Sequence, residues 1–276
     1  MELALCTISF RHHLVSLAEL ALWARNHGFS GIELWGAHAR HLADQPQYNA
    51  DWLATFGLRV PMISDYLPTE GPAAEWRRQT QALCHLARRW GAPRIRTFAG
   101  RKGSMETPPA ERAAVVAALR EQCLIAADHG LRLLVETHPG TLADNGASIL
   151  QLLDEVDHSA FGLNFDTLHV WEGGDDPLEL LTQTRSRVDY FHLKNVSERA
   201  RLGVFAPGNV YAAAGCRQGM VPLFEGCVDY RDFLAPLLND PDACASLEWF
   251  GPDAFTVLRQ DRQAIAELGR PLAACG

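Results

Sequence analysis

Residues 131–138 read LRLLVETH, a short aliphatic run that ends in a carboxylate and a histidine. Runs of this kind are typical of strands that are buried on both faces, as in parallel sheets. Similar runs recur along the chain, and stretches with the apolar spacing of helices separate them. We place eight strands at 3–8, 31–34, 58–63, 94–98, 132–136, 162–166, 190–194 and 245–248.

Two of the intervening stretches show clear helix boundaries. Residues 16–27 begin with Ser16, a preferred N-cap residue, and precede Gly28, a residue type that commonly ends helices. Residues 108–130 begin with proline and end in glycine. Eight repeats of strand and helix predict an α/β fold, a single (β/α)8 TIM barrel over residues 1–276, with these helices in its outer ring.

The composition is that of an ordinary globular protein. Hydrophobic residues make up 47% of the 276 residues and charged residues 21%, so the chain can bury a large core. The formal net charge of -8 disfavours nucleic acid and anionic membranes as partners, although a local group of arginines and lysines can still bind a small anion. We therefore expect a small-molecule partner, no nucleic acid and no membrane.

The cysteines and the start of the chain indicate a compartment. The seven cysteines, of which Cys275 is the last, are an odd number without a CxxC pair, which favours reduced thiols. The opening MELALCTISF lacks the basic region and longer apolar run of a signal peptide. We expect a cytoplasmic protein, and a homodimer is possible because the outer helices of barrels often pair.

One stretch interrupts the alternation of strands and helices. Residues 195–229 are rich in Gly, Ala and Pro, show no clear period and exceed the usual length of a loop. They follow the seventh strand, on the face where such barrels place their active sites. We expect a long active-site loop that covers the substrate, with a disordered insertion as the alternative.

Four consecutive strands end in side chains that can bind a metal ion: Glu136, Asp166, His192 and Glu248. The carboxyl ends of neighbouring barrel strands converge near the axis, so these side chains are expected to meet. Singly, such carboxylates are usually helix caps or surface salt bridges, and a lone histidine is usually a core residue. Together they favour a dication, because three buried carboxylates would otherwise be costly. Oxygen ligands with one imidazole suit Mn²⁺, Mg²⁺ or Co²⁺.

Two histidines lie close to these ligands in the sequence. His138 follows Glu136 by two residues, and His169 follows Asp166 by three. Both are candidates for proton transfer near neutral pH. The alternative for each is a hydrogen-bonding role beside the carboxylates or a plain loop position.

Cationic side chains near the same strand ends predict an anionic substrate. Arg96 and Lys194 lie at strand ends, and Arg101 and Lys102 follow the first of these strands. A substrate carboxylate is the expected counterpart. Glu33, also at a strand end, is interpreted as a polar residue that orients a neighbour. A metal beside a base suits isomerisation, epimerisation or dehydration alike.

Motifs along nearly the whole chain resemble the metal-dependent 3-dehydroshikimate dehydratases of the petrobactin siderophore pathway, within the xylose isomerase-like barrels. The motifs are LCTISFRH (5–12), GFSGIELWGAHA (28–39), MISDYL (62–67), IRTFAGRKGS (95–104), ETHPGTL (136–142), NFDTLHVWE (164–172), FHLKN (191–195), NVYAAAG (209–215), GMVPLFEG (219–226) and SLEWFG (246–251). The resemblance therefore includes the long stretch after the seventh strand.

The resemblance implies a lyase that converts 3-dehydroshikimate to protocatechuate and water. It implies that a metal, manganese before Mg²⁺ or Co²⁺, is bound by the four strand-end residues and polarises the C3 carbonyl. A base then removes a ring proton, and the C5 hydroxyl leaves as water. His138 is the implied base and His169 its partner in proton handling, with Arg96 and Lys194 at the reacting substrate. Tyr66, Tyr211, Arg101 and Lys102 are the further expected substrate contacts.

Other functions remain open at the level of the sequence. A sugar or hydroxy-ketone isomerase or epimerase would share the metal site. An endonuclease IV-like enzyme would share the barrel, but it needs three zinc ions, more histidines and a basic DNA groove. A metal-stabilised binding protein without activity is the third alternative. The sequence also leaves open whether the product enters siderophore synthesis or belongs to quinate and shikimate breakdown.

Overall fold

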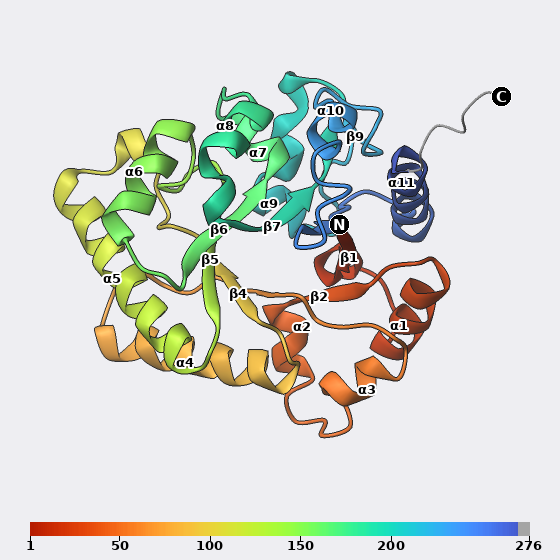
Figure 1. Cartoon of the computed structure of the whole chain (residues 1–276), viewed down its shortest axis with the longest axis horizontal. Helices are drawn as coiled ribbons and strands as arrows, with labels where there is room; N and C mark the ends of the chain where they lie inside the picture. Colours follow the sequence, from red (N-terminus) through yellow and green to blue (C-terminus); the bar gives the residue numbers. More distant parts are fainter. Residues whose placement is uncertain (270–276) are drawn as a thin grey trace.

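The computed structural model describes residues 1–269, and its centre is a closed barrel of eight parallel strands surrounded by helices (Figure 1). Around the barrel the order is β1-β10-β7-β6-β5-β4-β3-β2, so the chain runs once around the axis. The strands are β1 (Glu2–Cys6), β2 (Gly31–Trp35), β3 (Ile63–Ser64), β4 (Arg94–Thr97), β5 (Arg132–Glu136), β6 (Phe161–Asp166), β7 (Val188–Leu193) and β10 (Cys244–Leu247). The predicted TIM barrel is confirmed. Cys275 lies outside the described residues.

Two predicted strands differ from the observed ones. Residues 58–63 were expected to form a strand, but β3 consists of only Ile63–Ser64. Pro61 has no N–H to donate to a neighbouring strand, and upstream of it only an isolated bridge joins Arg59 to Gly31. At the first strand, Thr7–Phe10 turns into a short 3-10 helix, η1, instead of continuing to residue 8.

The outer ring consists mainly of α1 (Leu17–Asn26), α4 (Ala73–Arg89), α5 (Pro109–Asp128), α6 (Gly146–Val156), α8 (Pro177–Thr184), α10 (Tyr230–Leu234) and α11 (Ala254–Leu268). Shorter helices are α2 (Gly36–His41), α3 (Ala50–Ala54) and α7 (Thr167–Glu172). The expected cap of α1 is present, because Ser16 and Glu19 bind each other's backbone N–H groups in a capping box. No helix among residues 1–269 is long and apolar enough to cross a membrane.

The barrel interior changes from apolar to polar along the strands. Met62, Leu134, Tyr190 and Cys244 form a small buried cluster of their own within the barrel. Side chains two positions further along a strand point to the same face. Tyr190 is therefore followed inside by His192, and Leu134 by Glu136, so the strand ends present ionisable groups to a closed, buried space.

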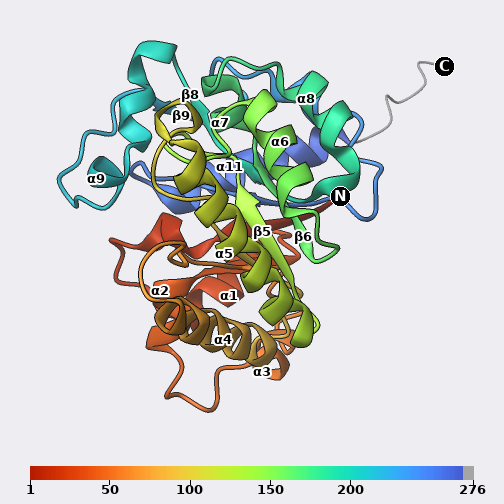
Figure 2. The same ribbon diagram turned by 90° about the vertical axis from the view of Figure 1, so that its left-hand side faces the viewer.

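The stretch 195–229 contains short regular elements instead of a structureless loop. It forms β8 (Asn195–Val196), the 3-10 helix η4 (Arg199–Phe205), the one-turn helix α9 (Pro207–Val210) and β9 (Met220–Val221). Strands β8 and β9 pair in antiparallel fashion at the base of the stretch. In Figure 2 the cyan segment projects from the barrel and carries α9 at its outer part.

Helix α11 holds the base of this segment through a buried carboxylate. Asp261 accepts a hydrogen bond from the backbone N–H of Leu223 at 2.9 Å. Burial raises the pKa of Asp261 to about 7, and nearby Glu225 adds to the effect. The folded protein therefore binds a proton here that the unfolded chain has already released at mildly acidic pH.

We predict that Asp261→Asn stabilises the protein at alkaline pH. Because the pKa of Asp261 is higher in the folded than in the unfolded state, the wild type loses stability as pH rises from about 4 to about 7. The amide cannot ionise but can still accept the Leu223 hydrogen bond. The free energy of unfolding should rise by on the order of 2 kcal/mol near pH 8 and by much less near pH 4. Urea denaturation at both pH values measures it, and an equal effect at both would contradict this explanation.

Candidate metal centre and active site

The structure brings the four predicted ligands together. Glu136, Asp166, His192 and Glu248 each offer a ligand atom, and these atoms lie within 4.8 Å of one another. Nδ1 of His192 lies 3.5 Å from Glu136 Oε1, 3.6 Å from Glu248 Oε1 and 4.0 Å from Asp166 Oδ2. All four side chains are buried. Three carboxylates and one imidazole nitrogen thus surround one point at the carboxyl ends of the strands.

Glu33 fixes the orientation of the His192 ring. Nε2 of His192 lies 3.0 and 3.1 Å from the two carboxylate oxygens of Glu33, and Ser64 donates a hydrogen bond to the same carboxylate. Since the Nε2 proton is directed to Glu33, the Nδ1 atom faces the other carboxylates. A carboxylate behind a histidine is the common support of a metal-binding imidazole. Glu33 thus has the contact that the expected orienting role requires.

The charges at this point do not balance without a further cation. The cluster contains four carboxylates and two permanent cations: Glu33, Glu136, Asp166 and Glu248 with Arg96 and Lys194. Nε of Arg96 lies 2.9 Å from Glu136 Oε2, and Nζ of Lys194 lies 2.8 Å from Glu248 Oε2 and pairs with Asp166. When His192 is neutral, as metal binding at Nδ1 requires, two negative charges remain, which is the charge that a dication would compensate. The residues present therefore fit a divalent metal.

The same charges control protonation in the cluster. Burial opposes a charge on Lys194, but Asp166 and Glu248 outweigh it and raise the pKa of the ammonium well above its ordinary value. Burial also opposes protonation of His192, yet Glu248, Glu33 and Glu136 raise its pKa well above the usual range. A metal at Nδ1 would have to displace that proton.

Two histidines lie side by side next to the cluster. The ring centroids of His138 and His169 are 4.5 Å apart. Nδ1 of His138 donates to the carbonyl oxygen of Pro139 at 2.7 Å, which leaves Nε2 as the free acceptor. Burial, with His169 as the second cause, lowers the pKa of His138 to about 3, so this imidazole is neutral at physiological pH. It is therefore in the form that a general base requires.

The sequence reasoning missed Glu172. Its carboxylate lies 2.7 Å from Nδ1 of His169 and fixes that ring as the carbonyl of Pro139 fixes the ring of His138. The two residues are three positions apart on α7, a spacing that brings helical side chains together. The spacing of His169 and Glu172 within TLHVWE is the sequence signal that could have indicated this contact.

Aromatic and cationic side chains line two adjoining cavities beside the cluster. A cavity of about 50 Å³ is lined by Arg96, Glu136, His138, His169, Lys194 and Glu248, together with Tyr66 and the segment residues Phe205, Val210 and Tyr211. A second cavity of about 550 Å³ shares Tyr66, His138 and Tyr211 and extends to Arg101. The hydroxyl groups of Tyr66 and Tyr211 lie 2.6 Å apart. Burial raises the pKa of both phenols, so they stay neutral hydrogen-bond donors.

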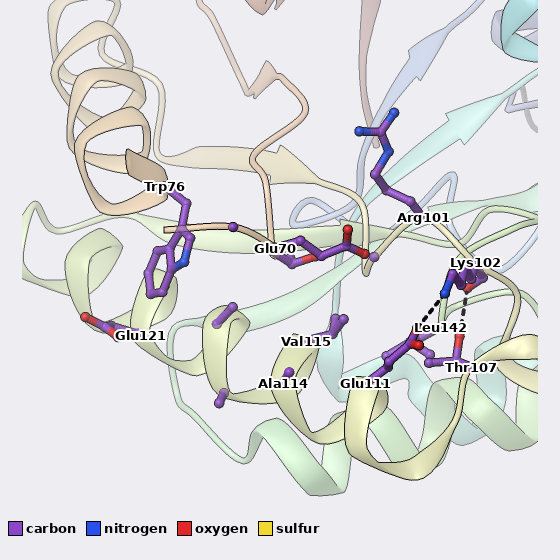
Figure 3. Close-up of a pocket in the computed structure, with 15 residues that line it drawn as sticks. Glu70, Trp76, Arg101, Lys102, Thr107, Glu111, Ala114, Val115, Glu121 and Leu142 are labelled. Carbon is purple, nitrogen blue, oxygen red and sulfur yellow. Dashed lines mark hydrogen bonds and ion pairs between the residues drawn. The ribbon is translucent and has the colours of Figure 1, made fainter. Parts of the chain in front are cut away.

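Arg101 and Lys102 differ in position although they are neighbours in the sequence. In Figure 3 the Lys102 side chain points toward Glu111, whereas the Arg101 side chain points away from it. Lys102 Nζ lies 2.7 Å from the Glu111 carboxylate, and it lines an outer groove of about 650 Å³ beside α5. Arg101 borders both this groove and the outer cavity of the site. The structure thus does not bring Lys102 to the proposed site, because an ion pair holds it on α5.

The barrel with its buried carboxylate and histidine cluster is the architecture of metal-binding TIM-barrel enzymes. The family model for the xylose isomerase-like TIM barrel matches residues 21–270. The chain belongs to this family.

Individual relatives and solved structures show which members of the family this chain is similar to. The chain is 43% identical over 272 residues to the 3-dehydroshikimate dehydratase of Bacillus anthracis, covering 96% of each chain. It is also similar to a crystal structure of the probable 3-DHS dehydratase involved in petrobactin synthesis from that organism, with a TM-score of 0.92, 42% identity and coverage of 96% of this chain and 99% of the other. These matches confirm the resemblance inferred from the motifs. The IOLI protein, solved with a zinc atom, shares the fold with a TM-score of 0.74, 17% identity and coverage of 98% and 96%.

We predict that Glu248→Gln removes metal binding without unfolding the protein. The substitution replaces one of three carboxylates around the cluster by a neutral amide, a poorer ligand for a hard dication. Metal affinity should fall by about 100-fold or more, since even supporting residues are worth about 10–100-fold. Titration of the chelator-treated protein with Mn²⁺ measures it, with circular dichroism as the test of folding. Glu121→Gln, at an exposed ion pair with Arg77, is the matched control. Unchanged affinity in the Glu248 variant would show that the cluster does not hold the metal.

Proposed function

We propose that this protein is a metal-dependent 3-dehydroshikimate dehydratase, a hydro-lyase that produces protocatechuate and water. The observation that carries the proposal is the identity of 43%, over an alignment of 272 residues that covers 96% of this chain, to a dehydratase of that substrate. The buried cluster and its two neighbouring histidines supply groups that such a reaction needs.

Glu136, Asp166, His192 and Glu248 are the proposed ligands of the metal, and Mn²⁺ is the proposed ion because an oxygen-rich set with one imidazole suits it. A bound divalent cation would supply Lewis-acid polarisation of the substrate carbonyl. Arg96 and Lys194, paired with Glu136 and Glu248, hold these carboxylates in place beside the cavity.

His138 is the proposed general base. Its Nε2 takes a ring proton next to the carbonyl, while its Nδ1–H stays bound to the Pro139 carbonyl and keeps the ring in position. His169, whose ring contacts Glu172, is the proposed donor of a proton to the departing hydroxyl, which leaves as water. The resulting dienone becomes aromatic by moving one further proton from carbon to oxygen. Atoms then balance as one molecule of protocatechuate and one of water.

Arg101 is the proposed partner of the substrate carboxylate. Arg96 and Lys194 are already paired with buried carboxylates, whereas Arg101 has no ion-pair partner within residues 1–269. It borders the outer cavity with Tyr66 and Tyr211; the Tyr211 hydroxyl donates to Tyr66, which leaves the Tyr66 hydroxyl proton for the same anion. Guanidinium groups bind carboxylates through two parallel hydrogen bonds.

The alternative of a sugar or hydroxy-ketone isomerase is not favoured. The dehydratase likeness extends over 96% of both chains and thus includes the long segment that lines the cavity. The relative's part in petrobactin synthesis favours siderophore assembly over quinate and shikimate breakdown as the use of the product. A single domain over residues 1–276, a cytoplasmic location and a possible homodimer remain proposals; the six described cysteines, all free, support the second.

We predict metal-dependent formation of a catechol from 3-dehydroshikimate. Chelator-treated protein should leave the ultraviolet absorbance unchanged, and addition of Mn²⁺ should produce the rising absorbance of protocatechuate, because carbonyl polarisation and proton removal are both needed. His138→Ala loaded with Mn²⁺ is the control, and it should bind the ion but lose turnover by about 100-fold or more. No product with Mn²⁺, Mg²⁺ or Co²⁺ would reject the dehydratase and direct the search to isomerase substrates.

We predict that Arg101→Gln weakens substrate binding while Lys102→Gln does not. Loss of a charge-assisted contact to the carboxylate should raise KM by about 10-fold or more with little change in kcat. Lys102 carries the same charge one residue away but is paired with Glu111, so it is the matched control. Steady-state kinetics of both variants decides the matter. Equal KM values would remove Arg101 from the substrate site.

A further inference from the structure

The tip of the long segment, residues 204–217, closes one side of the inner cavity. Phe205, Pro207, Val210 and Tyr211 all line this cavity together with the cluster residues of the barrel. The Tyr211 ring also stacks on Trp35, with centroids 6.0 Å apart and planes 17° apart. The position of the tip therefore determines the shape of the site.

The tip is organised by its own hydrogen bonds. Asn209 donates to the carbonyl oxygens of Val204 and Cys216 at 2.8 and 2.7 Å, and its Oδ1 accepts from the Cys216 N–H. Arg217 donates to the carbonyl oxygens of Asn209 and Ala212. The tip can therefore keep its shape as a unit while its contacts to the barrel form or break.

The base of the segment is fixed separately. The buried Asn195 side chain donates to the carbonyl oxygens of Leu223 and Val228 at 2.7 and 2.9 Å and accepts from the N–H groups of Val196 and Val228. Asp261 holds the Leu223 N–H as well. The base is thus anchored within the protein, and the placement of the tip depends on contacts further out.

Arg11 connects the tip to the barrel at its mouth. It follows β1 and η1, and its Nε donates to the Val210 carbonyl oxygen at 2.7 Å. Nη1 donates to the Ile8 carbonyl at 3.1 Å, and the guanidinium lies 5.0 Å from the centroid of the Phe250 ring. Three contacts therefore fix this side chain. Burial, with Arg217 as the second cause, lowers the pKa of Arg11 to about 10, so it remains charged at neutral pH.

We propose that Arg11 is a positioning residue that latches the tip 204–217 over the cavity through the Val210 carbonyl and so places Tyr211 against Tyr66. Arg11 is not among the residues that line the inner cavity, so it acts through the tip. The Tyr66–Tyr211 hydrogen bond also joins the tip to the barrel, and the His12 side chain adds a contact to the Val210 backbone. The kinetic consequence rests on the proposed function; the structural consequence does not.

The latch predicts a shift between closed and open tips. A hydrogen bond from a charged donor is worth about a factor of 10 or more in an equilibrium constant. Without it, the binding-competent closed form is less populated, and the apparent affinity for substrate falls by the same fraction. KM should therefore rise by up to about 10-fold, and kcat should change little, since bound substrate restores the closed tip.

The position of the tip can be measured without turnover. Leu14 lies close to Arg11 in the sequence and is 109% exposed, and Cys216 on the tip is also exposed. In a protein with Leu14→Cys, Cys227→Ser and Cys275→Ser, spin labels at positions 14 and 216 report the distance across the mouth. Intact Arg11 should give one narrow distance distribution, and Arg11→Met should add a longer population. Arg201→Met, which removes an arginine bound to Glu198 on the same segment, should leave the distribution unchanged.

A conservative variant separates positioning from folding. Arg11→Lys retains a charged donor and should lie between the wild type and Arg11→Met in both distance distribution and KM. If Arg11→Met does not fold, the distance distribution and KM of Arg11→Lys still test the latch. Identical distance distributions in the wild type and the Arg11 variants would overturn the latch, whether or not the protein turns over 3-dehydroshikimate. Lack of turnover with an altered distribution would reject only the proposed function.

Discussion

The requirement to neutralise a buried set of carboxylates governs this molecule. Four acidic side chains meet at the carboxyl ends of the strands, and two cations from the same strand ends offset only half of their charge. Such a group is tolerated in a protein interior only when each charge has a close partner. This constraint explains why Arg96 and Lys194 are themselves buried, and why the sequence near the strand ends is so rich in ionisable residues. A divalent ion would complete the balance and would also supply Lewis-acid chemistry at the site.

The barrel makes this arrangement possible because its strands change character along their length. Inward side chains at the amino ends, such as Leu134 and Tyr190, fill the interior with apolar volume, and those two residues further on carry charge. Burial of the apolar amino ends stabilises the barrel, so the polar carboxyl ends do not have to contribute to its stability. Residues that bind, orient and transfer protons can then be supplied by separate strands and by the segment after β7, without disturbing the packing that holds the barrel together.

The sequence predicted the features that depend on local spacing, such as which side chains lie at strand ends. It did not predict contacts between residues that are far apart in the chain. Strand-end spacing was enough to place Glu136, Asp166, His192 and Glu248 at one point, because parallel strands share an edge. Residues 58–62 were expected to belong to β3, although Pro61 in this stretch lacks the N–H that a strand donates to its neighbour. Arg101 and Lys102 are adjacent basic residues, so the sequence does not distinguish their roles. In the structure Lys102 is paired with the Glu111 carboxylate on α5. Arg11 reaches a carbonyl 199 residues away, a contact that leaves no local trace.

The ammonium group of Lys194 gives the protein a resident cation inside its metal cluster. It already pairs with Asp166 and Glu248, two of the four ligand candidates. The polypeptide can therefore fold around this internal counter-ion before any metal arrives, unlike small zinc domains, whose folding needs the ion. Folding of the barrel and binding of the ion can then be separate steps. The metal-free protein then keeps its fold, and the ion changes the charge of the cluster and leaves the barrel as it is.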